Sequence, residues 1–99
     1  MNYRNKELLN FARNIPYCMA CKKSNDGTII AAHSNSLTDG KGTGIKASDS
    51  AIAYICHECH NTIDNSNTPK DTKRTIWLEA SLKSYRYMIE NGILKLAKH

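Results

Sequence analysis

The stretch C-H-E-C-H-N-T-I-D at residues 56–64 is the part of the sequence that decides the fold. Two residues separate Cys56 from Cys59, and an upstream pair, Cys18 and Cys21, has the same spacing. Two such pairs supply four thiolates, which is the ligand set of a closed, tetrahedral zinc site. The sequence therefore predicts a structural Zn²⁺ held by all four cysteines, with four reduced core cysteines as the alternative.

Two polar side chains in the same stretch, His60 and Asp64, are left over by such a zinc site. A helix beginning near His57 and running to about Asn65 would place them on one face, because they are four residues apart. An imidazole and a carboxylate on adjacent turns can hold a second, catalytic cation. The alternative use of the histidines is a Cys₃His zinc site, in which His57 or His60 replaces one sulfur.

The composition indicates a single small domain that needs stabilisation beyond its hydrophobic core. The chain has 99 residues, of which 40% are apolar and seven are aromatic, so its core is modest. A zinc ion could contribute on the order of 10 kcal/mol of coupled folding free energy. No apolar run approaches the roughly 18 residues of a membrane span, and the N-terminus lacks a secretory segment. We therefore expect a cytoplasmic protein whose cysteines are metal ligands and not disulfides.

The formal net charge is +5, and it becomes +3 once four thiolates and one Zn²⁺ are counted. A basic balance favours a polyanionic partner such as DNA. The alternative is that the charge only keeps the protein soluble.

The pattern of apolar residues predicts an α+β fold with helices at both ends. Residues 3–13 suit a helix that Ile15-Pro16 ends, and residues 28–32 suit a strand pairing with residues 51–55. Thr68-Pro69 announces a long helix over about 69–91, which Asn91-Gly92 closes. Its core-facing stripe is predicted from apolar residues at steps of mostly three and four, namely Ile76, Leu78, Leu82, Tyr85 and Ile89, and Trp77 and Met88 widen that stripe.

The segment between the cysteine pairs, Lys22 to Ile55, is 34 residues long, which exceeds the spacing of a short zinc ribbon. It contains a polar, glycine-rich loop over 34–50, where Lys41 and Lys46 are the side chains expected to meet phosphates. The alternative is an ordinary connection.

His33 lies in the same segment, at the end of the first predicted strand. Taken alone, it is best explained as a hydrogen-bonded surface histidine. If zinc clips the two cysteine pairs together, however, strand-borne His33 comes close to His60 and Asp64 on the helix. Two strands, one helix and a histidine facing a metal form the layout of a ββα-metal site.

The pattern C-M-A-C, I-I-A-A-H, a glycine-rich loop with G-T-G and a lysine, Asp49 and C-H-E-C-H-N-T-I-D resembles the HNH (ββα-metal, His-Me finger) nuclease superfamily. Within it, the chain is most similar to YbcO-like prophage nucleases, relatives of the Ref-type recombination nucleases. The likeness covers residues 18–64. It implies a single HNH-like domain over residues 1–99, with its zinc and active-site core at about 17–66.

The resemblance also implies a function and roles. The protein would be a metal-dependent DNA endonuclease, prophage-encoded and linked to recombination, with a phage or host recombination protein as a second partner. His33 would be the general base that deprotonates the attacking water. His60 and Asp64 would hold one divalent cation, Mg²⁺ or Mn²⁺ first and Zn²⁺ or Ni²⁺ next. Hydrolysis would leave 5′-phosphate and 3′-hydroxyl ends.

The sequence departs from the family pattern at two positions. Ala32 stands where these sites commonly carry a metal ligand, and Ala51 stands where the middle asparagine is expected. Asp49 is the nearest candidate to orient His33 or to complete the metal shell, and Asn35 is a poorer one. Asp49 could also simply cap a loop or helix. Two other function classes therefore stay open: a non-catalytic zinc-knuckle module that binds nucleic acid or protein, and a purely structural assembly protein.

Overall fold

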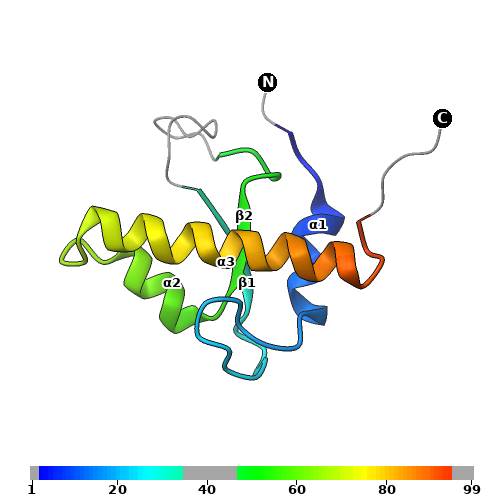
Figure 1. Cartoon of the computed structure of the whole chain (residues 1–99), viewed down its shortest axis with the longest axis horizontal. Coiled ribbons are helices and arrows are strands. Elements are labelled where there is room, and N and C mark those ends of the chain that lie inside the picture. The colour runs from blue at the N-terminus through cyan, green and yellow to red at the C-terminus, as the bar shows by residue number, and fades with distance from the viewer. Residues whose placement is uncertain (1–2, 35–46, 95–99) are drawn as a thin grey trace.

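The computed structural model describes residues 3–34 and 47–94. Lys41, Lys46 and Asn35, which the sequence singles out, lie outside these ranges. The elements along the described chain are α1 (Lys6–Asn10), the 3₁₀ helix η1 (Phe11–Asn14), β1 (Ile30–His33), β2 (Ile52–Ile55), α2 (His57–Asp64) and α3 (Lys70–Glu90) (Figure 1). This order and content agree with the predicted α+β class.

β1 and β2 form an antiparallel pair at the centre of the molecule. Ile30 pairs with Ile55 at one end, and His33 pairs with Ile52 at the other. All four residues of β2 are buried, whereas β1 is buried only at Ala32. The predicted pairing of these two segments is confirmed, and His33 is the last residue of its strand.

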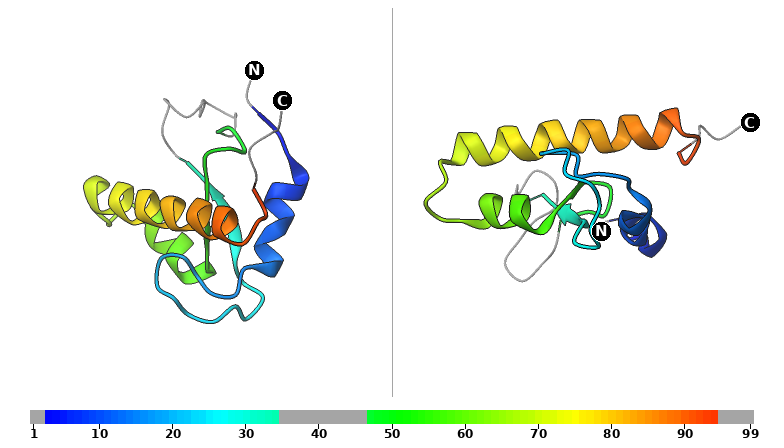
Figure 2. Two further views of the ribbon diagram at one scale, coloured as in Figure 1. Left: turned by 45° about the vertical axis from the view of Figure 1, so that its right-hand side comes forward. Right: turned by 90° about the horizontal axis from the view of Figure 1, so that it is seen from below.

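The long helix α3 forms one layer, and the strands, α1 and α2 lie beside one another in a second layer against one side of α3 (Figure 2). Three side chains of α3 bond to the backbone of the strands. The Trp77 indole N–H donates to the Ala32 carbonyl (3.0 Å), and the Ser81 hydroxyl donates to the Ile52 carbonyl (2.8 Å). The Ser84 hydroxyl accepts from the Tyr54 N–H at 3.0 Å. These bonds fix where α3 crosses β2.

The predicted core-facing stripe of this helix is correct only in part: Trp77 and Met88 are buried and Ile76 and Tyr85 pack against the core, but three of its members are exposed. The buried side chains of α3 are Trp77, Ala80, Ser84 and Met88. Leu82 and Ile89 are 67% and 62% exposed, and Leu78 is exposed as well. Small side chains, Ala80 and Ser84, occupy the centre of the buried face because the helix lies close to the backbone of β2. A pattern of apolar residues cannot predict that Ser84 is buried, because serine is polar. The helix also starts one residue later than its threonine signal suggests, with Pro69 as its N-cap.

Within the described ranges, no helix is both long and apolar enough to cross a membrane.

The N-terminal segment is a short α-helix that tightens into a 3₁₀ turn, and not one helix over residues 3–13. Asn5 begins it, because its side chain accepts a hydrogen bond from the Leu8 N–H. The Tyr54 hydroxyl donates to the Leu8 carbonyl, and the Phe11 ring meets the Tyr54 ring edge-on. This packing brings residues 3–5 next to the end of β1.

Candidate metal centre and histidine–aspartate site

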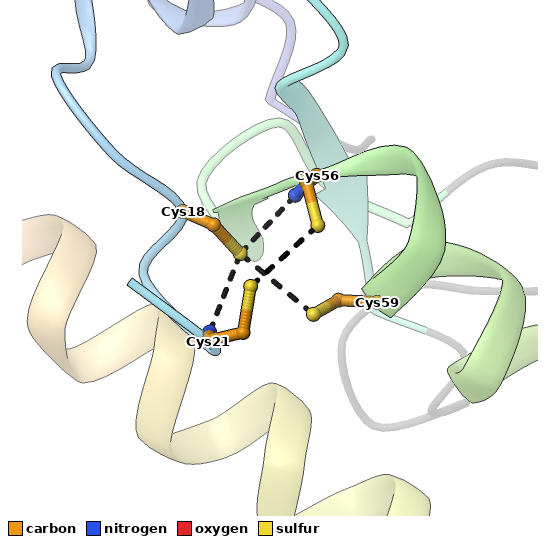
Figure 3. A group of neighbouring side chains, drawn as sticks. All are labelled: Cys18, Cys21, Cys56 and Cys59. Carbon is orange, nitrogen blue, oxygen red and sulfur yellow. Dashed lines mark hydrogen bonds between the residues drawn. The ribbon is translucent and has the colours of Figure 1, made fainter. Parts of the chain in front are cut away.

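Two pieces of backbone present the four cysteines. Cys18 and Cys21 belong to the knuckle that follows η1, where the Lys22 N–H donates to the Cys18 carbonyl at 2.9 Å. Cys56 is the N-cap of α2, and Cys59 lies in its first turn. Their four Sγ atoms all lie within 4.8 Å of one another and point toward a common centre (Figure 3).

The spacing of the sulfurs suits a tetrahedral zinc ion. Sγ of Cys18 lies 3.8 Å from Sγ of Cys59, and Sγ of Cys21 lies 3.8 Å from Sγ of Cys56. Ligands at the ~2.3 Å Zn–S bond length sit about 3.8 Å apart at the corners of a tetrahedron. A disulfide would need about 2.05 Å, and all four cysteines are free. The cysteines therefore form a site fit for a structural metal ion, as predicted.

The electrostatics of the cluster also call for a cation. Burial by itself would raise the pKa of the Cys18 thiol, but backbone N–H groups of Cys21, Cys56 and Ala20 point at its sulfur and lower the pKa from 9.0 to about 7. Burial and the neighbouring sulfurs raise the pKa of Cys59 far above its ordinary value. A divalent ion bound among the sulfurs would supply positive charge that favours their thiolate forms.

A second site is built around His33, at the end of β1. Its Nε2 lies 2.7 Å from Oδ1 of Asp49, a carboxylate that is 3% exposed. The same carboxylate accepts the Asn5 N–H at 2.7 Å, and the Arg4 guanidinium lies 3.3 Å from it. The Asp49 N–H in turn donates to the Tyr3 carbonyl at 2.8 Å. The N-terminal segment therefore holds Asp49, and Asp49 holds the imidazole.

Asp49 is ionised in this arrangement. Burial alone would raise the pKa of its carboxyl group, but the hydrogen bonds from His33 and the Asn5 N–H, together with the charge of Arg4, lower it below its ordinary value. A carboxylate only accepts hydrogen bonds, so the His33 Nε2–H is the donor. In a neutral imidazole this leaves the lone pair on Nδ1.

A cavity of about 370 Å³ lies beside this pair. Its lining residues are Arg4, Asn5, Lys6, Leu9, His33 and Asp49. Two cations and a histidine at one cavity suit an anionic group such as a phosphate. The sequence contains no signal for Arg4 or Asn5, because they lie 45 and 44 positions away from Asp49 along the chain.

The predicted cation pair is present on α2. Nε2 of His60 lies 3.3 Å from Oδ2 of Asp64, and both side chains are accessible to solvent. In the described ranges, however, the four cysteines are the one group that brings three or more His, Cys, Asp or Glu ligand atoms within 4.8 Å of one another. The structure thus brings His33 to Asp49 and His60 to Asp64, but it does not gather the two pairs into one ligand cluster.

His57 and Glu58, which separate Cys56 from Cys59, have partners other than the sulfurs. His57 contacts the Asn61 side chain at 3.2 Å, and Glu58 pairs with Lys23 at 3.4 Å. Neither His57 nor His60 belongs to the cysteine group, so the geometry favours four sulfur ligands over the Cys₃His alternative.

Comparison with known proteins adds no assignment: no family model, curated protein or solved structure matches the chain.

Proposed function

We propose that this protein is a metal-dependent DNA endonuclease of the HNH type, which hydrolyses phosphodiester bonds. The observation that carries the proposal is the His33–Asp49 contact at the cavity lined by Arg4 and Lys6. The order of elements supports it as well. A strand that ends in the base, an antiparallel strand and a helix with the cation pair follow one another, as the sequence resemblance leads us to expect.

His33 acts as the general base. With Nε2–H bonded to Asp49, its Nδ1 is the atom that takes a proton from the attacking water. The water oxygen then bonds to phosphorus, and the bond from phosphorus to the 3′-oxygen breaks. The released 3′-oxygen takes a proton from solvent, which leaves 5′-phosphate and 3′-hydroxyl ends. Arg4 and Lys6, at the same cavity, offset the charge of the phosphate.

His60 and Asp64 would hold the divalent cation. Adjacent ligands of an octahedral ion at ~2.1 Å lie about 3.0 Å apart, and these two donor atoms are 3.3 Å apart. A carboxylate with an imidazole suits Mn²⁺, and Mg²⁺ also binds through few protein ligands and several waters. The cation would neutralise charge that develops on the phosphate. His33 is a base in this scheme and not a ligand, so no three-ligand cluster is required.

Nicking of supercoiled plasmid tests the proposal. Purified protein supplied with Mn²⁺ or Mg²⁺ should convert the plasmid to the open circular form, and His33→Ala should abolish the conversion. The matched control is His57→Ala, which removes an exposed histidine of α2 that lies outside both polar pairs. If His33→Ala nicks as fast as the parent protein, the assigned base is wrong.

A non-catalytic zinc-knuckle module is the second candidate. The separation of the two polar pairs and the absence of ligand side chains at Ala32 and Ala51 favour it. Metal titration distinguishes the candidates. The module should bind one zinc per chain and nothing more, whereas the nuclease should bind a second divalent ion that His60→Ala removes.

A further inference from the structure

A second recess, of about 240 Å³, lies between the cysteine knuckle and the C-terminal half of α3. It shares no lining residue with the His33 cavity. Its lining residues are Tyr17, Met19, Lys22, Lys83, Arg86, Tyr87 and Glu90. The proposed cleavage reaction does not use it.

The recess is positively charged. Lys22, Lys83 and Arg86 line it against the single carboxylate of Glu90. The ion pairs of the described residues are made by other basic side chains, namely Arg4, Lys23, His33 and His60. The three cations of the recess are exposed to solvent, and no carboxylate of the described residues pairs with them, so they can bind an anion without breaking such a pair.

The fold fixes the two walls. On α3, the lining residues Lys83, Arg86, Tyr87 and Glu90 are spaced as one face of a helix. On the knuckle, Lys22 adopts a left-handed backbone conformation (φ 66°), and its N–H is bonded to the Cys18 carbonyl. The same turn presents Cys18 and Cys21, so the proposed metal ion would also hold this wall of the recess in place.

Aromatic rings add a second kind of contact. Tyr17 is 40% exposed, and Tyr87, half-buried, lines the opposite wall. Cations that follow a backbone, next to rings on which bases can stack, are how proteins bind single-stranded nucleic acid. A duplex does not offer the faces of its bases. We propose that this recess binds an unpaired nucleic-acid strand, through its phosphates on Lys22, Lys83 and Arg86 and a base stacked on Tyr17.

Fluorescence anisotropy of a labelled 15-nucleotide oligothymidylate, with no divalent cation added, tests the charge contacts. Lys83→Glu should weaken binding about tenfold. The matched control Lys70→Glu makes the same charge change at an exposed position of α3 outside the recess and should alter binding less than about twofold. Replacing Lys22, Lys83 and Arg86 together by alanine should reduce the slope of log K against log salt by about 2, since each single-strand phosphate contact contributes ~0.7.

The stacking contact has its own pair of variants. Tyr17→Ala should weaken binding at least about fivefold, whereas Tyr17→Phe, which keeps the ring, should bind like the parent. Zinc content and melting temperature verify that each variant is folded. Equal losses from Lys83→Glu and Lys70→Glu, equal affinity for a duplex of the same length, or displacement of the oligonucleotide by polyglutamate at matched charge would each overturn the inference. Because no cleavage is measured, failure here leaves the nuclease proposal standing, and a normal His33→Ala nicking rate leaves this inference standing.

Discussion

His33 shows how little the identity of a residue says about its chemistry. An imidazole at a strand end has either nitrogen available, and the partner of one nitrogen decides the role of the other. Here Asp49 bonds Nε2, and Arg4 and Asn5 fix Asp49 in turn. The sequence suggested Asp49 as one of two orienting candidates. Arg4 and Asn5, which hold Asp49, could not be found from the sequence, because only the fold brings the N-terminal segment next to Asp49.

Replacing the carboxylate tests that arrangement. Asp49→Asn keeps the shape of the side chain but removes the charge that fixes the imidazole tautomer. We expect plasmid nicking to fall by roughly 10²–10⁴-fold with zinc content unchanged. A plasmid assay beside His57→Ala measures this, and an Asp49→Asn enzyme within a factor of two of the parent would show that Asp49 does not orient the base.

The pH dependence of stability follows from the same carboxylate. Because the folded-state pKa of Asp49 lies below its ordinary value, the stabilisation is fully present above the unfolded pKa of about 3.9 and is lost only as pH falls through the lower, folded value. At pH 7, Asp49→Asn should therefore be less stable than the parent by ~1.5–3 kcal/mol, and the Asp49 contribution should be lost only below about pH 4. Urea unfolding measures both. A variant as stable as the parent at pH 7 would show that the carboxylate does not stabilise the fold.

At the scale of elements, the sequence predicted which segments are helices and strands better than it predicted their orientation. The helix expected near His57 to Asn65 and the strand before His33 both form, because caps, β-branched residues and cysteine spacing act locally. The facing of α3 was predicted only in part, and the reason is non-local. Its centre lies against the backbone of β2, where Ala80 and Ser84 fit and leucine does not.

Two alanine substitutions on α3 compare a residue that is buried with one that the sequence also assigned to the core but that is exposed. Met88 is completely buried, so Met88→Ala should cost about 2–5 kcal/mol of unfolding free energy. Leu82 is 67% exposed, so Leu82→Ala should cost less than about 0.5 kcal/mol. Both changes leave helix propensity high, and urea denaturation of the zinc-bound protein measures them. A larger loss from Leu82→Ala than from Met88→Ala would place Leu82 in the core, as the sequence pattern suggested, and contradict its observed exposure.

For the whole molecule, the cysteine cluster is part of the core and not an attachment to it. Cys18, Met19 and Cys56 are buried in the same hydrophobic cluster as Trp77 and Met88. The knuckle, the start of α2 and the end of β2 therefore meet around the sulfurs, and the Met19 N–H donates to the Tyr54 carbonyl at 3.0 Å. Removing the metal ion should loosen the core itself.

The free energies of folding and of zinc binding indicate how far the core would loosen. A domain of this size is stable by about 5–15 kcal/mol, whereas structural zinc binding contributes about 10–16 kcal/mol. The metal-free chain should thus be largely unfolded, since nothing replaces the free energy that metal binding contributes to folding. Trp77 is the single tryptophan of the sequence and is 7% exposed, so its emission reports on the core directly. Chelation should shift that emission to the red and abolish cooperative melting, and one equivalent of Zn²⁺, but not Mg²⁺, should restore both. If the chelated protein keeps its emission and its melting temperature, the core is complete without metal. The recess between the knuckle and α3 must then be held by packing alone.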